Sequence, residues 1–322
     1  MGSLHAPRAA RRRPGPRAVA RLALATLVVN VLIVATGGLV RLTGSGLGCP
    51  SWPDCAPGSL LPTGELGWHG YVEFGNRALT DVVAAVTATM LVCAYLARPV
   101  RRDVRRGALL VALGIPAQAG LGGVTVVTHL NPWVVSLHFV LSMAIVAAAT
   151  WLVRRSREGD APARSLIHPL LHRLAISLVV VAAAVVYLGT IVTGSGPHAG
   201  APDVHRIGID PRTVAQLHAD AVMLLIGLSA ALAVAVRATG APAAVRRATV
   251  VVVAVELAQG TIGYVQYFTR LPIALVDLHL LGASLLVVAL TGAVLSTRTR
   301  GPGTGGLALP AQPAVREPAA PV

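Results

Sequence analysis

The sequence predicts an all-α integral membrane protein in which eight membrane-spanning helices form two tandem four-helix bundles. Hydrophobic residues make up 54% of the 322 residues, charged residues make up 12%, and the mean hydropathy is +0.70. An ordinary soluble domain carries about 25% charged residues, so this composition excludes a soluble protein. Three cysteines are too few for a disulfide scaffold, and no Cys/His spacing typical of a zinc or iron–sulfur site occurs.

Each predicted span is a long apolar stretch with few charges. A spanning helix needs roughly 20 apolar residues to cross a hydrocarbon core of about 30 Å. The stretches that meet this requirement are 22–40, 66–97, 107–128, 132–153, 174–194, 214–236, 248–267 and 274–297. The first stretch, with arginines before it, could instead be a cleaved signal peptide, but its length and the lack of an A-x-A-like exit favour a span.

The arginines predict the orientation of these helices. All 27 basic residues are arginine, against 13 acidic residues, which gives a formal charge of +14. Short cytoplasmic loops carry the excess of basic residues, and 22 arginines fall in the N-terminus, the three alternate loops and the C-terminal tail. The other five are Arg41, Arg77, Arg206, Arg212 and Arg270. We therefore expect a multi-pass protein of the cell membrane with both termini cytoplasmic, whose charge faces the lipid bilayer and binds no nucleic acid.

An internal repeat divides the spans into two halves. The tetrapeptide Thr43–Gly46 recurs at Thr193–Gly196, 150 residues later. Gln118, Gly122 and Val124 likewise match Gln259, Gly263 and Val265. Two units with an even number of helices share one orientation, so we expect a pseudo-twofold axis along the membrane normal. The predicted segments are a cytoplasmic N-terminus (1–21), an N-terminal half (22–153), a cytoplasmic linker (154–173), a C-terminal half (174–297) and a disordered cytoplasmic tail (298–322).

Four histidines are the main candidates for a functional site. His69, His138, His218 and His279 lie one each in the second, fourth, sixth and eighth spans, near the outer end of each helix. Ionisable residues inside spans are costly and usually functional. One pair in each half at equal depth is the pattern that two bis-histidine haem sites require. A proton or ion pathway and purely structural histidines remain as alternatives.

Glu73 makes the two halves unequal. It lies one helical turn from His69 and shares its face, whereas Val222 occupies the matching position after His218. Glu73 is therefore a candidate for proton handling, and the half that contains it is the candidate reactive half. The alternative is an ion pair with Arg77 at i,i+4 that only anchors the helix end.

Arginines and cysteines on the outer side are further candidates. Arg41, Arg77 and Arg206 lie at or near the outer edge, where haem propionates would point, and arginine pairs well with carboxylates. Simple outer-surface arginines are an equal alternative. Cys49 and Cys55 lie in the first outer loop, an oxidising location where a disulfide can persist. A structural bridge and a redox-responsive or haem-handling role both remain open for them.

Together these residues resemble the haem A synthase family of cytochrome oxidase assembly proteins. The resemblance covers about residues 20–297 and depends on the combination of motifs rather than on any one of them. The motifs are Gly38–Pro50 after the first span, His69 with Glu73–Arg77, Thr193–His198 after the fifth span, and the three remaining histidines in their helices.

The resemblance implies an enzyme that oxidises the C8 methyl of haem O to a formyl, giving haem A. It implies that His218 and His279 ligate the iron of a haem b cofactor, and that His69 and His138 face the iron of the substrate haem. Glu73 matches the family's catalytically important glutamate, and Cys49 with Cys55 matches the paired cysteines of its bacterial members. Pathway logic adds an unidentified electron donor and contact with haem O synthase as expected partners. The competing function is a di-haem b-type electron carrier or quinol oxidoreductase.

Overall fold

Eight long helices make up nearly all of the computed structural model, which describes residues 13–301. The helices are α1 (Pro16–Leu42), α2 (Gly67–Leu96), α3 (Arg102–Val127), α4 (Pro132–Arg157), α5 (Pro169–Ser195), α6 (Pro211–Ala238), α7 (Ala243–Phe268) and α8 (Ile273–Ser296). All eight are long and apolar enough to cross a membrane, so the predicted eight-span architecture is confirmed. A 3₁₀ turn, η1 (Gly64–Leu66), precedes α2.

Several helices begin a few residues before the apolar stretches predicted from the sequence, for example α1 at Pro16 and α5 at Pro169. Proline occupies one of the first two positions of α1, α4, α5 and α6, where its missing N–H costs nothing and its fixed φ suits a helix. Asp210 caps α6 by accepting hydrogen bonds of 2.9 Å from the backbone N–H and the hydroxyl of Thr213. These donors stabilise the carboxylate and lower the pKa of Asp210.

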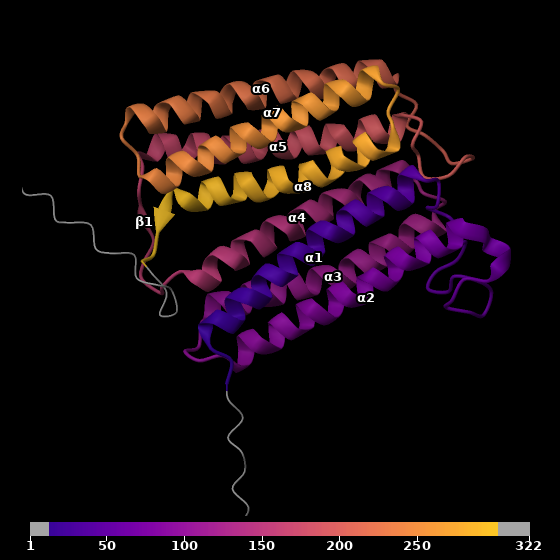
Figure 1. The fold of residues 1–322 in the computed structure, drawn as a ribbon, viewed down its shortest axis with the longest axis horizontal. Helices are drawn as coiled ribbons and strands as arrows, with labels where there is room; N and C mark the ends of the chain where they lie inside the picture. The colour runs from indigo at the N-terminus through magenta and orange to yellow at the C-terminus, as the bar shows by residue number, and fades with distance from the viewer. Residues whose placement is uncertain (1–12, 302–322) are drawn as a thin grey trace, which may run out of the picture.

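The helices form two groups of four that lie side by side (Figure 1). Within each group every helix contacts its neighbours in chain order, and the first helix also contacts the fourth. The groups meet where α8 packs against α1 and α4, and where α4 packs against α5. Exchanging the two halves maps the α1–α8 contact onto the α5–α4 contact, as the predicted pseudo-twofold requires, although the axis itself stays a prediction.

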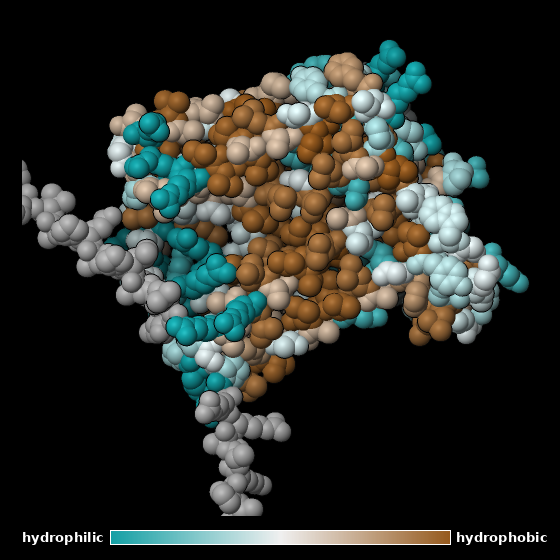
Figure 2. Space-filling view, viewed as in Figure 1, coloured by the Kyte–Doolittle hydropathy of each residue, from teal (hydrophilic) through white to brown (hydrophobic). Residues whose placement is uncertain are grey.

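Each group has its own buried apolar cluster. Val111, Val146 and Leu152 belong to the cluster of α1–α4, and Leu178 and Leu225 to that of α5–α8. Large hydrophobic side chains also cover the outside of the helices, and Figure 2 shows them as a band across the middle of the molecule. An apolar outer surface is stable only in lipid, so both the buried and the exposed sides of these helices fit a membrane.

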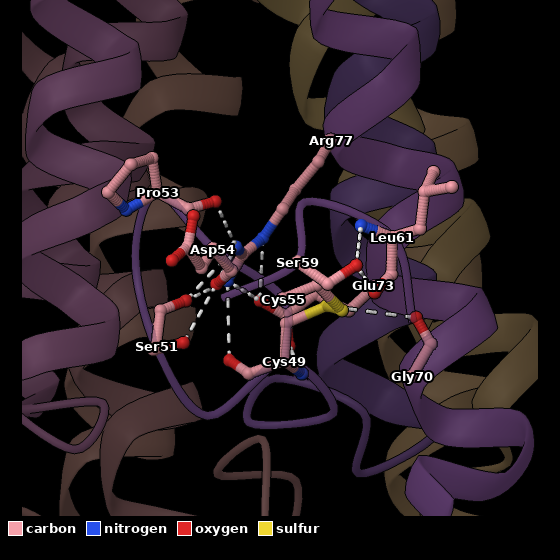
Figure 3. The surroundings of a disulfide bond; sticks show 10 residues. All are labelled: Cys49, Ser51, Pro53, Asp54, Cys55, Ser59, Leu61, Gly70, Glu73 and Arg77. Atoms are coloured by element: carbon pink, nitrogen blue, oxygen red, sulfur yellow. Dashed lines mark hydrogen bonds and ion pairs between the residues drawn. A yellow bond between two sulfur atoms is a disulfide. The ribbon is translucent and has the colours of Figure 1, made fainter. Parts of the chain in front are cut away.

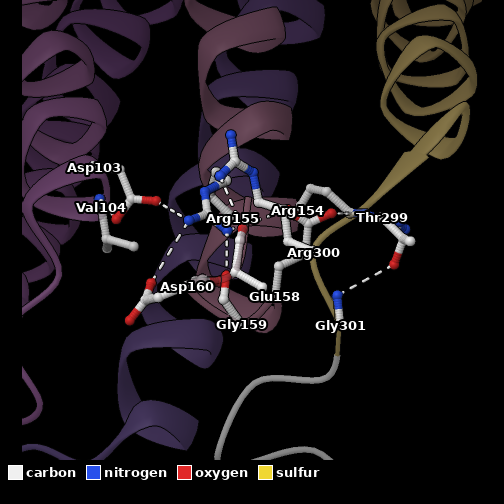
Figure 4. Close-up of polar contacts among 12 residues, drawn as sticks. Asp103, Val104, Arg154, Arg155, Glu158, Gly159, Asp160, Thr299, Arg300 and Gly301 are labelled. Atoms are coloured by element: carbon white, nitrogen blue, oxygen red, sulfur yellow. Dashed lines mark hydrogen bonds and ion pairs between the residues drawn. The ribbon is translucent and has the colours of Figure 1, made fainter. Parts of the chain in front are cut away.

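Both ends of the described chain lie at one end of the bundle, which we call the inner end. Strand β1 (Arg164–Ser165), between α4 and α5, pairs with strand β2 (Arg298–Thr299), which follows α8. Nearby, Arg155 pairs with Asp103, Glu158 and Asp160 (Figure 4). The first residues of the predicted disordered tail are thus ordered by strand pairing. Residues 1–12 and 302–322, which hold the rest of the tail and most of the predicted N-terminal segment, lie outside the described residues.

Candidate functional site

The histidines of α2 and α6 have their Nδ1 atoms fixed by hydrogen bonds. In the C-terminal half, Nδ1 of His218 lies 3.0 Å from the carbonyl oxygen of Val185. A carbonyl only accepts, so Nδ1 carries the proton and Nε2 keeps its lone pair. In the N-terminal half, Nδ1 of His69 lies 2.9 Å from the hydroxyl oxygen of buried Ser45. Fixing one nitrogen in this way orients an imidazole for metal ligation through the other.

The histidines of α4 and α8 have matching surroundings in the two halves. Gln118 on α3 donates to the backbone carbonyl of His138 at 3.0 Å, and Gln259 on α7 donates to that of His279 at 2.9 Å. Each imidazole also lies beside a glycine of the same helix as the glutamine, so that a Cβ added at Gly122 or Gly263 would lie 3.4 or 3.5 Å from the ring. The predicted repeat therefore extends to side-chain contacts.

Nδ1 of His138 and Nδ1 of His279 are buried and have no hydrogen-bond partner among the described residues. An unpaired buried polar atom is unusual and calls for a missing partner. Within residues 13–301, no group of three or more His, Cys, Asp or Glu side chains could hold a metal ion. One histidine from each of two helices per half is the donor set that a bis-histidine haem site requires.

Glu73 connects α2 to the first outer loop (Figure 3). Its Oε2 accepts the backbone N–H of Cys49 at 2.8 Å, and its Oε1 accepts Nη2 of Arg77 at 2.6 Å. The residue as a whole is 6% exposed. The predicted i,i+4 ion pair is therefore present, one turn from His69. Because each oxygen of a carboxylate can accept two hydrogen bonds, Oε2 still has room to accept a proton.

The side chain of Arg77 holds the same loop through the loop's backbone carbonyl groups. Its guanidinium donates to the carbonyl oxygens of Cys49, Ser51, Pro53 and Asp54 at 3.1 to 3.3 Å (Figure 3). Each of these donors is used within the protein, so Arg77 acts here on the loop and not as a free anion site. The loop is also closed by the Cys49–Cys55 disulfide, which the sequence predicted.

Trp52, at the tip of the disulfide loop, packs on α3. The backbone of Gly123 lies so close to the indole that an added Cβ would be 2.5 Å from the ring. The neighbouring Gly122 contacts His138, so the loop covers the outer end of the N-terminal half beside its histidines. Sequence reasoning missed both Trp52 and Ser45. The repeated Thr43–Gly46 motif was a signal for Ser45, and a large aromatic in a polar loop was a signal for Trp52.

The other outer arginines have different contacts. Arg41, at the end of α1, donates to the carbonyl oxygens of His198 and Thr193 at 2.8 and 3.2 Å and so joins the two halves. Arg206 is exposed and donates to the Pro197 carbonyl at 3.4 Å. A propionate contact from Arg41, Arg77 or Arg206 thus stays a prediction.

Two further carboxylates belong to helices of the C-terminal half. Glu256 on α7 is 3% exposed and accepts the hydroxyl of Ser229 at 2.8 Å. Asp277 on α8 lies against α1, where a Cβ at Gly38 would be 2.6 Å from its Oδ1. Glycine at position 38 therefore lets the two halves approach closely. Neither carboxylate was assigned a role from sequence.

Comparisons with known proteins identify the family of this chain. The family described as Cytochrome oxidase assembly protein (COX15-CtaA) matches residues 20–291. The chain is 30% identical over 173 residues to a protein named Heme A synthase from Listeria welshimeri, covering 52% of this chain and 56% of the relative. It is 32% identical over 145 residues to another of that name from Geobacillus kaustophilus, covering 44% of each. The chain thus spans about half the length of the curated relatives it matches.

Proposed function

This chain belongs to the COX15-CtaA family of cytochrome oxidase assembly proteins, and from that premise we propose that it is a membrane oxidoreductase that converts haem O to haem A. The observation that carries the proposal is the asymmetry between the halves. Both have a histidine pair, but Glu73 lies one turn from His69, whereas Val222 occupies the matching position near His218. A di-haem electron carrier has no need for a carboxylate beside one pair only.

The N-terminal half is the proposed substrate site. His69 and His138 hold the haem O iron, with His69 oriented by Ser45 and the outer end covered by Trp52 of the disulfide loop. The reaction turns the C8 methyl into a formyl in successive hydroxylations followed by loss of water, a four-electron oxidation whose oxidant and oxygen atoms come from outside this chain. Glu73 accepts protons at Oε2 or positions the methyl, while Arg77 keeps its carboxylate charge compensated.

The C-terminal half is the proposed site of a haem b cofactor. His218 and His279 would hold its iron, and the Val185 carbonyl fixes the proton of His218 on Nδ1. When bound, haem b supplies one-electron transfer. Gln259 holds the backbone at His279, so that its imidazole keeps its position on α8.

The membrane setting defines the proposed partners. We place the inner end, with its arginines, in the cytoplasm and the disulfide loop outside the cell membrane. Haem O synthase would supply the substrate, and a separate electron donor would supply electrons to the C-terminal half.

The test is to express the full chain in bacterial membranes that make haem O but not haem A, and to identify the extracted haems by chromatography and mass. Haem A should appear with the wild-type chain and be absent with His69→Ala. If only haem O is recovered while the protein is folded and carries haem, the proposed activity is wrong.

A further inference from the structure

A cavity at the inner end of the N-terminal half has no part in the proposed reaction. Its volume is about 550 Å³, and residues from the ends of α1, α2, α3 and α4 line it. It lies at the end of the bundle opposite to the disulfide loop (Figure 1). The apolar part of its lining, called the apolar wall below, includes Val19, Ala20, Ala94, Ala97 and Val104.

The rest of the lining is strongly cationic. Five arginines and two carboxylates line the cavity, which gives it a net charge of three positive. The arginines are Arg17, Arg21, Arg98, Arg101 and Arg157, and the carboxylates are those of Glu158 and Asp160. Figure 2 shows hydrophilic residues gathered at this end of the molecule.

Both carboxylates already have cationic partners. Asp160 accepts a hydrogen bond from Nε of Arg101 at 2.9 Å. Glu158 pairs with Arg154 at 2.7 Å and with Arg155 at 3.2 Å (Figure 4). Among residues 13–301, by contrast, no carboxylate pairs with the other four cavity arginines, Arg17, Arg21, Arg98 and Arg157. All four are exposed. Arg17 and Arg21 are one turn apart on α1 and so share one helix face.

We propose that this cavity binds the phosphate headgroup of an anionic phospholipid, with the glycerol and upper acyl chain against its apolar wall. A cluster of arginines around a concave site at the cytoplasmic surface is the arrangement that attracts anionic lipid, and guanidinium groups suit phosphate oxygens because they bind them in a bidentate manner. The chain's own N-terminal residues 1–12 contain three arginines and no carboxylate, so they lack the charge to fill it.

The C-terminal half serves as an internal comparison. Its inner end has a smaller cavity of about 380 Å³ lined by Ser165–His168 and Thr239–Pro242, without any arginine. Arg237 and Arg247 lie near that end of α6 and α7 and are exposed, but they line neither cavity. They are a matched control, because neutralising them removes charge from the same membrane surface without touching the proposed site.

The test uses the purified full chain with its haem. Retention of phosphatidylglycerol is measured by native mass spectrometry against phosphatidylcholine with the same acyl chains, and thermal stability is measured with each lipid and with inorganic phosphate. We expect phosphatidylglycerol alone to be retained and to raise the unfolding temperature. Arg17→Gln with Arg21→Gln and Arg98→Gln should weaken its binding about fivefold per arginine, on the order of a hundredfold in total.

The control with Arg237→Gln and Arg247→Gln should keep phosphatidylglycerol at the wild-type level. Ala20→Phe, which fills the apolar wall and leaves every charge in place, should lose the lipid as the triple variant does, and it decides the question if the triple variant does not fold. Equal losses in the control and the triple variant would mean a general surface charge and overturn the proposal. Equal stabilisation by inorganic phosphate would reassign the cavity to a soluble anion and overturn it as well.

Discussion

The carboxylate of Glu73 accepts the backbone N–H of Cys49 at 2.8 Å, so a residue inside helix α2 directly holds the first cysteine of the outer disulfide loop. Its other oxygen pairs with Arg77, whose guanidinium binds four carbonyl groups of the same loop. Glu73 therefore has two potential roles, as an anchor of the loop and as a participant in the reaction. Substitutions can separate them.

Glu73→Gln should abolish haem A formation with little loss of bound haem. The amide oxygen can still accept the Cys49 N–H, but the side chain no longer takes up protons, and loss of general acid–base catalysis typically costs a factor of 10² to 10⁴. The readout is the ratio of haem A to haem O in extracted membranes. Glu256→Gln is the matched control, because it neutralises a buried carboxylate of the other half and keeps the Ser229 contact. Wild-type conversion by Glu73→Gln would restrict Glu73 to the anchoring role.

Removing the disulfide should destabilise the protein without dismantling the loop. The bridge joins cysteines six residues apart, so the chain-entropy estimate is roughly 2 kcal/mol. Cys49→Ser with Cys55→Ser should lower the unfolding temperature while bound haem persists, because Glu73 and Arg77 still hold the loop backbone. Adding Arg77→Gln to the double cysteine variant should lower the free energy of unfolding by more than the sum of the two separate effects, since both changes release the same segment. Strict additivity in this cycle would show that the two restraints act independently.

Gly123→Ala should displace Trp52 from α3. The added Cβ would lie 2.5 Å from the indole, and overpacking of this kind costs about 1–3 kcal/mol. We expect a lower unfolding temperature and reduced haem A yield. Gly120→Ala on the same helix is the control, because its Cβ meets nothing within 4 Å and should stabilise the helix by about 0.5–1 kcal/mol. Similar behaviour of the two variants would argue against the packing of Trp52 on Gly123.

Gly263→Val should weaken haem binding in the C-terminal half. A Cβ at this position lies 3.5 Å from the His279 ring, so the valine methyl groups would force the imidazole to move. Perturbing the surroundings of a metal ligand typically lowers affinity 10- to 100-fold, and haem b per protein, measured by absorbance, should fall. Gly260→Val, one turn away, adds a Cβ that meets nothing within 4 Å, and this variant should keep its haem. Equal haem contents would indicate that His279 does not hold haem.

The sequence predicted the eight spans because they depend on hydropathy alone. The histidine pairs, which it indicated because each histidine recurs with the four-helix repeat, stay a prediction. It also indicated the Glu73–Arg77 pair, whose i,i+4 spacing is local. The contacts of the outer loops were missed. Ser45 meets His69 across 24 residues, and Arg41 meets His198 across 157. Such contacts depend on the path of a loop and on how the two halves pack, which no local pattern encodes.

The division of labour between the two halves is the central claim, and the haem composition of two purified variants tests it most directly. Each is expressed in membranes that make haem O but not haem A, and its haems are extracted and identified by mass. The account predicts that His138→Ala retains haem b but contains neither haem O nor haem A, whereas His279→Ala loses haem b. Loss of haem b from His138→Ala, with haem O or haem A still bound, would contradict the account.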